Sequence, residues 1–310
     1  MATAVEWPEG KRFAFTIFDD PDSQTLEDSR IVYSFLADLG FLTTKGVWVH
    51  GPYREDNSKS ETCENPAYLE HVLDLQRRGF EIGFHNASLR SSQREDTRKA
   101  LDTFRRHFGA YPSAMSNHFS NSEAIYWGDA RTEGLARFIY RLATKNRDSG
   151  IYSGHIESSP YFWGDLCQAR IGYCRNFVFR DVNTLRLCPE MPYHDPVRPF
   201  VQCWYASAEG ANASLFQQTI SEVNQERLEE ERGACIMYTH FGKGFVEDGR
   251  LSTGFRKLME HLRRKNGWFV PVSALLQHLQ AKHGVHTLSS SERRRLEQRW
   301  LWEKLKYGTS

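Results

Sequence analysis

Carboxylate and imidazole side chains follow several apolar segments of this sequence, each at the point where the segment ends. The run 12–20 closes with Asp19 and Asp20, and later apolar runs are followed by His50, His85, His118 and His240. Such side chains bind divalent metals and transfer protons near neutral pH. The two aspartates alone would equally suit a turn and a helix cap before Pro21. Several such residues in one topological position favour a functional site, provided that the segments meet at one edge of a sheet.

The elements that would position these residues alternate between strand and helix. Apolar runs predict strands at 12–20, 45–50, 80–85, 112–118, 234–240 and 268–272. Helical spacing predicts helices at 25–39, 67–78, 91–108, 131–145, 215–232, 253–264 and 272–282, with a capping box of Ser92 and Glu95 in the third. This alternation indicates right-handed βαβ units and a parallel sheet, whose strands carry functional residues at their carboxyl ends.

Length and composition are those of a globular protein. The 310 residues suit one large α/β barrel or two ordinary domains. A net charge of +1 gives no reason to expect a nucleic-acid partner. The first residues do not resemble a signal peptide and no stretch could span a bilayer, so we expect a cytoplasmic location. The six cysteines form no Cys-x-x-Cys pair, which favours reduced thiols over a structural zinc cluster.

The last residues, 287–310, form a segment of different character. A helix is expected here, with Leu296, Trp300, Leu301 and Leu305 on one face and more basic than acidic residues on the rest. This helix either packs on the preceding domain, 1–286, or contacts a membrane surface or another subunit.

Three of the segments resemble the motifs of a known family. Thr16–Asp20 is similar to the first motif, T-F-D-D, of the polysaccharide deacetylases (NodB homology, carbohydrate esterase family 4). Phe80–His85 is similar to the second motif, and Ile236–His240 to the late strand that ends in histidine. The resemblance spans roughly residues 10–285. It implies a single-domain, distorted (β/α)7-type barrel and a divalent metal, most often zinc. It also implies Asp19 as general base, Asp20 and His85 as metal ligands, and His240 as general acid.

The second motif departs from the family pattern. The family has H-[ST]-x-x-H and so two histidine ligands, whereas this chain has Leu89 at the second position. Leucine cannot bind a metal, and we expect His118 to replace the missing ligand, which gives Asp20, His85 and His118. Two alternatives stay open at this point: a metal site that uses His50 or Asn86, and no metal at all.

The stretch 120–208 is rich in aromatic and turn residues, with short strand candidates at 151–156, 177–187 and 200–206. Most aromatic residues pack in cores, but aromatic faces also stack on sugars. Trp127 and Trp163 are therefore candidate saccharide contacts, and Asn117 and His50 are candidate polar contacts to the substrate.

The resemblance implies a metal-dependent hydrolase that removes an N-acetyl or other N-acyl group from an amino sugar or a saccharide precursor. A metal would polarise the amide and activate water, an aspartate would take a proton, and a histidine would supply one to the departing amine. Two alternatives are a hydrolase of the same family that cleaves a non-sugar amide C–N bond, and a metal-free, non-catalytic member that binds carbohydrate.

Overall fold

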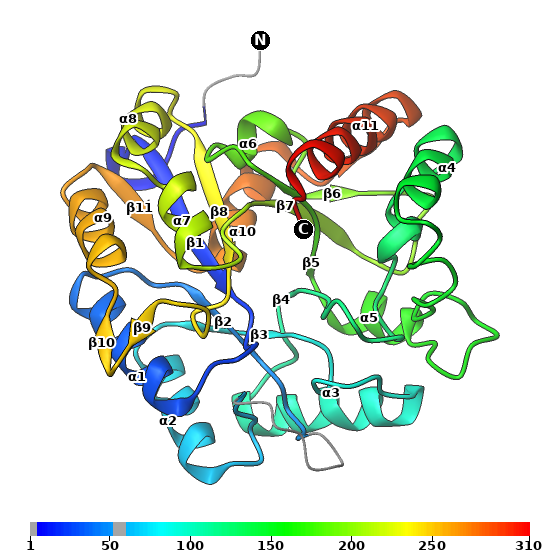
Figure 1. The fold of residues 1–310 in the computed structure, drawn as a ribbon, viewed down its shortest axis with the longest axis horizontal. Helices are drawn as coiled ribbons and strands as arrows, with labels where there is room; N and C mark the ends of the chain where they lie inside the picture. The colour runs from blue at the N-terminus through cyan, green and yellow to red at the C-terminus, as the bar shows by residue number, and fades with distance from the viewer. Residues whose placement is uncertain (1–4, 52–59) are drawn as a thin grey trace.

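Strand β1 (Phe13–Asp19) is one of the strands that form the wall of a closed barrel, and all its residues are buried. The structure, a computed structural model, describes residues 5–51 and 60–310. Seven parallel strands close the barrel in the order β1, β2, β3, β4, β5, β7, β8 and back to β1 (Figure 1). The other six are β2 (Thr44–Val47), β3 (Glu81–Phe84), β4 (Ala114–Met115), β5 (Tyr173–Phe179), β7 (Cys203–Ala208) and β8 (Ala234–Thr239). The predicted (β/α)7-type barrel is confirmed.

Register brings the functional ends of the strands together. Asp19 pairs with Thr239 of β8 on one side and with Lys45 of β2 on the other. The backbone N–H of Asp20 donates to the carbonyl of Thr239 at 2.8 Å, so the residues after β1 lie directly beside His240. Because the strands are parallel, their carboxyl ends lie on the same side of the barrel.

Gly83 on β3, which is separated from β1 by β2, makes room inside the barrel for the Phe18 ring. A Cβ atom at Gly83 of β3 would lie 2.7 Å from the Phe18 ring. A methyl group does not fit at that distance, so the glycine lets the aromatic ring fill the barrel.

Helices connect most of the strands and cover the barrel. They are α1 (Leu26–Asp38), α2 (Pro66–Arg77), α3 (Arg94–Phe108), α4 (Gly134–Ala143), α5 (Gly164–Arg170), α6 (Thr184–Leu187), α7 (Ala213–Thr219), α8 (Glu222–Glu230), α9 (Thr253–Arg263), α10 (Val272–His283) and α11 (Ser290–Tyr307), with the short 3-10 turns η1 (Pro8–Gly10) and η2 (Gly128–Arg131). Four small strands complete the sheets: β6 (Tyr193–His194), β9 (Val246–Glu247), β10 (Arg250–Leu251) and β12 (His286–Thr287), while β11 (Gly267–Phe269) pairs with β1.

Several predicted elements differ from the observed ones. The predicted Ser92–Glu95 capping box is wrong, because α3 starts after Gln93 and the Ser92 backbone N–H donates to Glu123 instead. The segment 151–156 forms turns and no strand, 177–187 splits into the end of β5 and helix α6, and 215–232 is two helices. The predicted strand 112–118 shortens to the two residues of β4, so His118 lies beyond it in a loop.

Helix α11 packs on the barrel beside α4 (Figure 1). Its start is a capping box of Ser289 and Glu292, and Leu296, Trp300 and Leu301 are buried. Contact of its outer side with a membrane surface or another subunit stays a prediction. Among residues 5–51 and 60–310, no helix combines the length and apolar character needed to cross a bilayer.

Candidate metal centre

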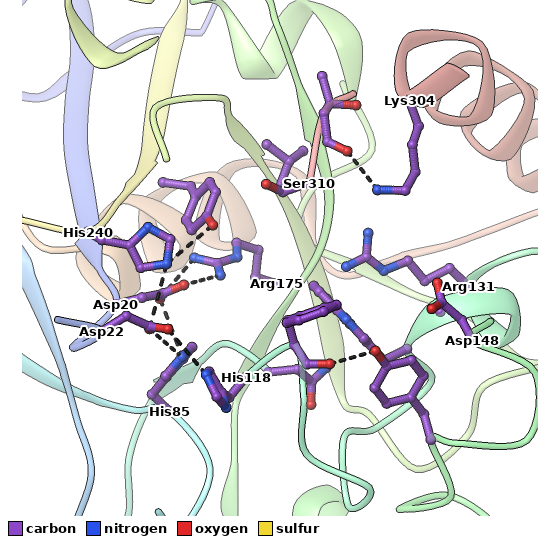
Figure 2. Close-up of a pocket in the computed structure, with 18 of the residues that line it drawn as sticks. Asp20, Asp22, His85, His118, Arg131, Asp148, Arg175, His240, Lys304 and Ser310 are labelled. Atoms are coloured by element: carbon purple, nitrogen blue, oxygen red, sulfur yellow. Dashed lines mark hydrogen bonds and ion pairs between the residues drawn. The ribbon is translucent and has the colours of Figure 1, made fainter. Parts of the chain in front are cut away.

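A cavity of about 320 Å³ lies at the carboxyl ends of the barrel strands (Figure 2). Its lining includes Asp20, Asp22, His85, His118, Arg175 and His240. These residues follow β1, β3, β4 and β8 or, for Arg175, lie within β5. The predicted convergence of polar residues from several strand ends is therefore present in the fold.

Asp22, His85 and His118 form a group with the geometry of a metal site. One potential ligand atom from each lies within 4.8 Å of those of the other two. His85 Nε2 lies 3.3 Å from Asp22 Oδ2, and His118 Nε2 lies 3.2 Å from Asp22 Oδ1. Figure 2 shows the two imidazoles pointing at the same carboxylate from separate loops. One carboxylate and two imidazoles are an ordinary ligand set for zinc.

A chain of hydrogen bonds fixes the tautomer of His85. The Ser116 hydroxyl donates to Asp20 Oδ1 at 2.7 Å, because an ionised carboxylate can only accept. The same hydroxyl oxygen lies 2.7 Å from His85 Nδ1 and must accept from it. Nε2 of neutral His85 therefore carries a lone pair directed at Asp22, which is the state that a metal ligand requires.

His118 is oriented in a similar way. Its Nδ1 lies 3.0 Å from Asn121 Oδ1, while the amide nitrogen of Asn121 donates to Glu123 at 2.8 Å. The Asn121 oxygen is thus an acceptor, His118 Nδ1 is the donor, and Nε2 again faces Asp22. Burial raises the pKa of Glu123 to about 7, against the hydrogen bonds that lower it.

The residues present fit a divalent ion. Asp22 Oδ2 and His85 Nε2 are buried, yet neither makes a hydrogen bond of acceptable geometry to any residue in 5–51 or 60–310. Burial alone would raise the pKa of Asp22, but the adjacent His118 and His85 side chains hold it well below its usual range. A cation between these atoms would satisfy both and would suit the anionic form of Asp22.

His240 lies beside this group without belonging to it. Its Nδ1 is 2.7 Å from the carbonyl oxygen of Ala211, which can only accept, so Nδ1 carries the proton. Its Nε2 lies 3.6 Å from Asp22 Oδ2 and 3.4 Å from the Tyr238 hydroxyl. Burial lowers the pKa of His240, against the opposing effect of Asp22 and Asp20. A neutral imidazole with an available lone pair thus faces the cavity.

Asp20, expected as a metal ligand, has a different set of partners. Both of its carboxylate oxygens pair with the buried Arg175 guanidinium, at 2.5 and 3.2 Å. Burial alone would raise the pKa of Asp20, but Arg175 lowers it. Since Asp22 lies nearest the two histidines, the geometry favours Asp22 over Asp20 as the carboxylate ligand.

Asp19, expected as the general base, is not among the residues that line the cavity. Its Oδ2 accepts hydrogen bonds from Lys45 Nζ at 3.0 Å and the Tyr33 hydroxyl at 3.1 Å, and its Oδ1 accepts one from the Phe241 N–H at 2.9 Å. Asp19 and Lys45 are both fully buried. A carboxylate held this way joins β1, β2 and the end of β8, and the geometry favours a structural role over proton transfer.

The candidate substrate contacts divide into two groups. Trp127 and Asn117 line the cavity. Trp163 instead lies in the core with its Nε1 donating to the Glu123 carbonyl. His50 is not part of the cavity lining and lies 3.2 Å from Glu64. Asn86, an alternative metal ligand, accepts a hydrogen bond from the His118 backbone N–H at 2.6 Å and so shapes that loop.

Three residues of the site were not predicted from the sequence: Asp22, Ser116 and Arg175. Asp22 lies in a Pro-Asp-Ser segment that is typical of a turn and helix cap, but the actual cap of α1 is Thr25. The sequence feature that could have identified Asp22 is that it is a third acidic residue shortly after Asp19 and Asp20. Arg175 lies inside a buried strand, and a basic residue there required an acidic partner.

Comparison with solved structures identifies the fold. Two structures whose names assign them as polysaccharide deacetylases match, from Mycobacterium smegmatis (13% identity, TM-score 0.52, 93% of this chain and 97% of that chain) and from Pseudomonas aeruginosa PAO1 (11%, 0.51, 91% and 95%). Puue allantoinase matches with 11% identity, a TM-score of 0.52, and 90% and 94% coverage. No protein-family model and no curated protein sequence matches the chain. The resemblance predicted from the motifs is confirmed in three dimensions: this chain has the NodB-like fold of the polysaccharide deacetylases.

Proposed function

We propose that this protein is a metal-dependent hydrolase that removes an N-acyl group from a small amino compound, such as an amino sugar, by cleaving its amide C–N bond. The observation that carries the proposal is the convergence of Asp22, His85 and His118 beside His240 in one cavity. The structural neighbours, which are named as deacetylases and an allantoinase, support the same reaction class.

The roles of the residues follow from their hydrogen bonds. A divalent ion, most readily zinc, held by Asp22, His85 and His118 would polarise the amide carbonyl and lower the pKa of water. His240 Nε2 accepts the proton of the attacking water as the new C–O bond forms, while Nδ1 remains bonded to Ala211. His240 then delivers that proton to the amine nitrogen as the C–N bond breaks. The nearby carboxylates of Asp22 and Asp20 stabilise the imidazolium between the two transfers.

The size of the cavity supports a small substrate. About 320 Å³ lies at the lower end of the range for small-molecule sites. Gly308, Thr309 and Ser310 line the same cavity, so the segment after α11 closes one of its walls. The Trp127 ring carries the Arg131 guanidinium on its face, and that face is therefore not free to stack on a sugar. A non-sugar amide thus remains an alternative substrate.

The direct test is acyl release by zinc-loaded protein from matched panels of N-acyl amino sugars and non-sugar N-acyl amines. We expect hydrolysis of one class, abolished by Asp22→Ala and reduced by His240→Gln. Hydrolysis of the N-acyl amino sugars alone would identify an amino sugar as the substrate class. Hydrolysis of the non-sugar N-acyl amines alone would identify a non-sugar amide. A protein that binds these compounds but releases no acyl group from either panel would contradict the proposal and support a non-catalytic binding protein.

A further inference from the structure

Two cationic side chains enter the same cavity from the side opposite the histidine cluster (Figure 2). Arg131 ends the turn η2, and Lys304 lies on helix α11. The Arg131 Cζ lies 3.2 Å from the ring centroid of Trp127 and 5.0 Å from that of Trp300. The two indole rings hold the planar guanidinium in place through cation–π contacts. This part of the cavity is therefore built jointly by the barrel and the C-terminal helix.

The Arg131 guanidinium has no anionic partner within the described ranges 5–51 and 60–310. Arg131 is only 2% exposed, no hydrogen bond or ion pair involves its guanidinium there, and its Nε is buried and unpartnered. Asp148 also lines the cavity, but its carboxylate accepts a hydrogen bond from the Tyr140 hydroxyl and makes no ion pair with Arg131. Burial lowers the pKa of Arg131 to about 10, so the group remains charged at neutral pH. A buried guanidinium without an anionic partner is destabilising, and a bound anion would offset that cost.

Lys304 adds a second positive charge next to Arg131. Among the residues that the structure describes, its Nζ donates one hydrogen bond, to the Thr309 carbonyl at 2.8 Å, and its other two N–H groups have no acceptor there. Burial lowers the pKa of Lys304 to about 8, and the Arg131 charge acts in the same direction. Both cations contact the same indole ring, since Arg131 Cζ lies 5.0 Å and Lys304 Nζ 5.7 Å from the ring centroid of Trp300, which places them in one part of the cavity.

We propose that Arg131 and Lys304 form a subsite for an oxyanion, a carboxylate or a phosphate group, on the substrate. This inference rests on the proposed function and narrows it to N-acyl compounds that carry a negative charge. The fork of a guanidinium matches two oxygens of either anion, and the lysine adds a point charge. The acyl group would lie at Asp22, His85 and His118, and the anion at the far side of the same cavity. Arg175 is already paired with Asp20, and the cations on the side of the cavity away from the histidines are Arg131 and Lys304.

The test measures anion binding without turnover, on protein stripped of metal by a chelator. Isothermal titration with inorganic phosphate and with succinate, at constant ionic strength in chloride, is expected to give saturable one-to-one binding. Arg131→Met and Lys304→Met should each weaken the binding at least tenfold. Arg131→Lys, which keeps the charge but loses the fork, should also weaken it. Lys243→Met removes a charge from another part of the cavity lining and should change affinity less than threefold.

The two anions distinguish the two sources of the charge. Tighter binding of phosphate than of succinate would indicate a substrate that carries a phosphate group. Tighter binding of succinate would indicate a substrate that carries a carboxylate group. Absence of saturable binding to the wild-type chain, or binding that is unchanged in Lys304→Met and in folded Arg131 variants, would overturn the subsite. Wild-type and Lys304→Met results decide the matter if the Arg131 variants do not fold.

This outcome is independent of hydrolysis because the protein in the titration holds no metal. A chain that binds the anions through Arg131 but never binds metal would refute the proposed function and keep the subsite. A chain that hydrolyses neutral N-acyl compounds as well as charged ones, with no change in KM in Lys304→Met, would keep the function and refute the subsite.

Discussion

His85 Nε2 lies 3.3 Å from Asp22 Oδ2, and no hydrogen bond of good geometry joins these two buried atoms. The other ring nitrogen of His85, Nδ1, is fixed by Ser116, and the other carboxylate oxygen of Asp22, Oδ1, lies 3.2 Å from His118 Nε2. Two buried lone-pair donors held face to face would be costly without a cation between them. The arrangement therefore predicts how metal binding, activity and stability change when residues in and around the site are replaced.

Ser116→Ala should weaken metal binding while leaving all three ligands in place. The substitution removes the acceptor that fixes the His85 tautomer, and the loss of such a partner usually costs 10- to 100-fold in metal affinity. Competition with a zinc-chelating dye measures the affinity. Ser158→Ala, at an exposed serine, is the matched control. Equal affinity of Ser116→Ala and the control would show that the hydrogen bond does not orient His85.

His240→Gln should abolish most of the activity and keep the metal. Loss of a positioned acid–base group typically lowers the rate by a factor of about 10² to 10⁴. The measurement is kcat for acyl release together with zinc content on the same sample. Loss of zinc in this variant would instead make His240 a ligand, and the assignment of proton transfer to its Nε2 would be wrong.

Asp19→Asn should destabilise the fold without removing the metal. The change leaves the fully buried Lys45 without its anionic partner, and a broken buried pair costs about 3–5 kcal/mol. Urea unfolding measures the loss, and the double variant Asp19→Asn/Lys45→Met should recover part of it. A variant of wild-type stability and normal metal content that has lost activity would return Asp19 to the role of general base.

Glu123 predicts a pH dependence of stability. Its pKa is raised by burial to about 7 in the folded chain, above the value of about 4.5 for the unfolded chain. The unfolded chain therefore releases a proton between these two pH values that the folded chain keeps. Stability that is fully present below pH 4.5 is lost as the pH rises through 7, by about 3 kcal/mol.

Glu123→Gln carries no titrating proton and should lack this contribution. The free energy of unfolding, measured in urea at pH 5 and pH 7.5, should fall less with pH in the variant than in the wild type. Glu157→Gln, at an exposed acid, should follow the wild-type profile. Parallel profiles for wild type and Glu123→Gln would show that Glu123 is ionised in the folded chain across this range.

The strands that build the site were predictable because buried parallel strands are continuous apolar runs. β1, β3 and β8 each end at or next to Asp19, His85 and His240, where the apolar pattern stops. The placement of His118 beside His85 also followed from this pattern, since adjacent parallel strands end at the same edge of the barrel.

The remaining part of the site depends on contacts between distant segments, which no local pattern encodes. Arg175 binds Asp20 across 155 residues of sequence, and this pairing turns Asp20 away from the role expected of it. Lys45 neutralises Asp19 from the next strand. Arg131 owes its position partly to Trp300 in the C-terminal helix, a contact that helical spacing alone could not reveal.

Zinc per chain, measured by elemental analysis of protein purified without chelator or nickel affinity, is the direct test of the metal centre. We expect near-stoichiometric zinc in the wild type and in His50→Ala, since His50 lies outside the cavity lining, and loss of zinc in Asp22→Ala and His118→Ala. Absence of metal from the wild type after zinc is supplied, or full retention in Asp22→Ala, would contradict a metal centre built from Asp22, His85 and His118.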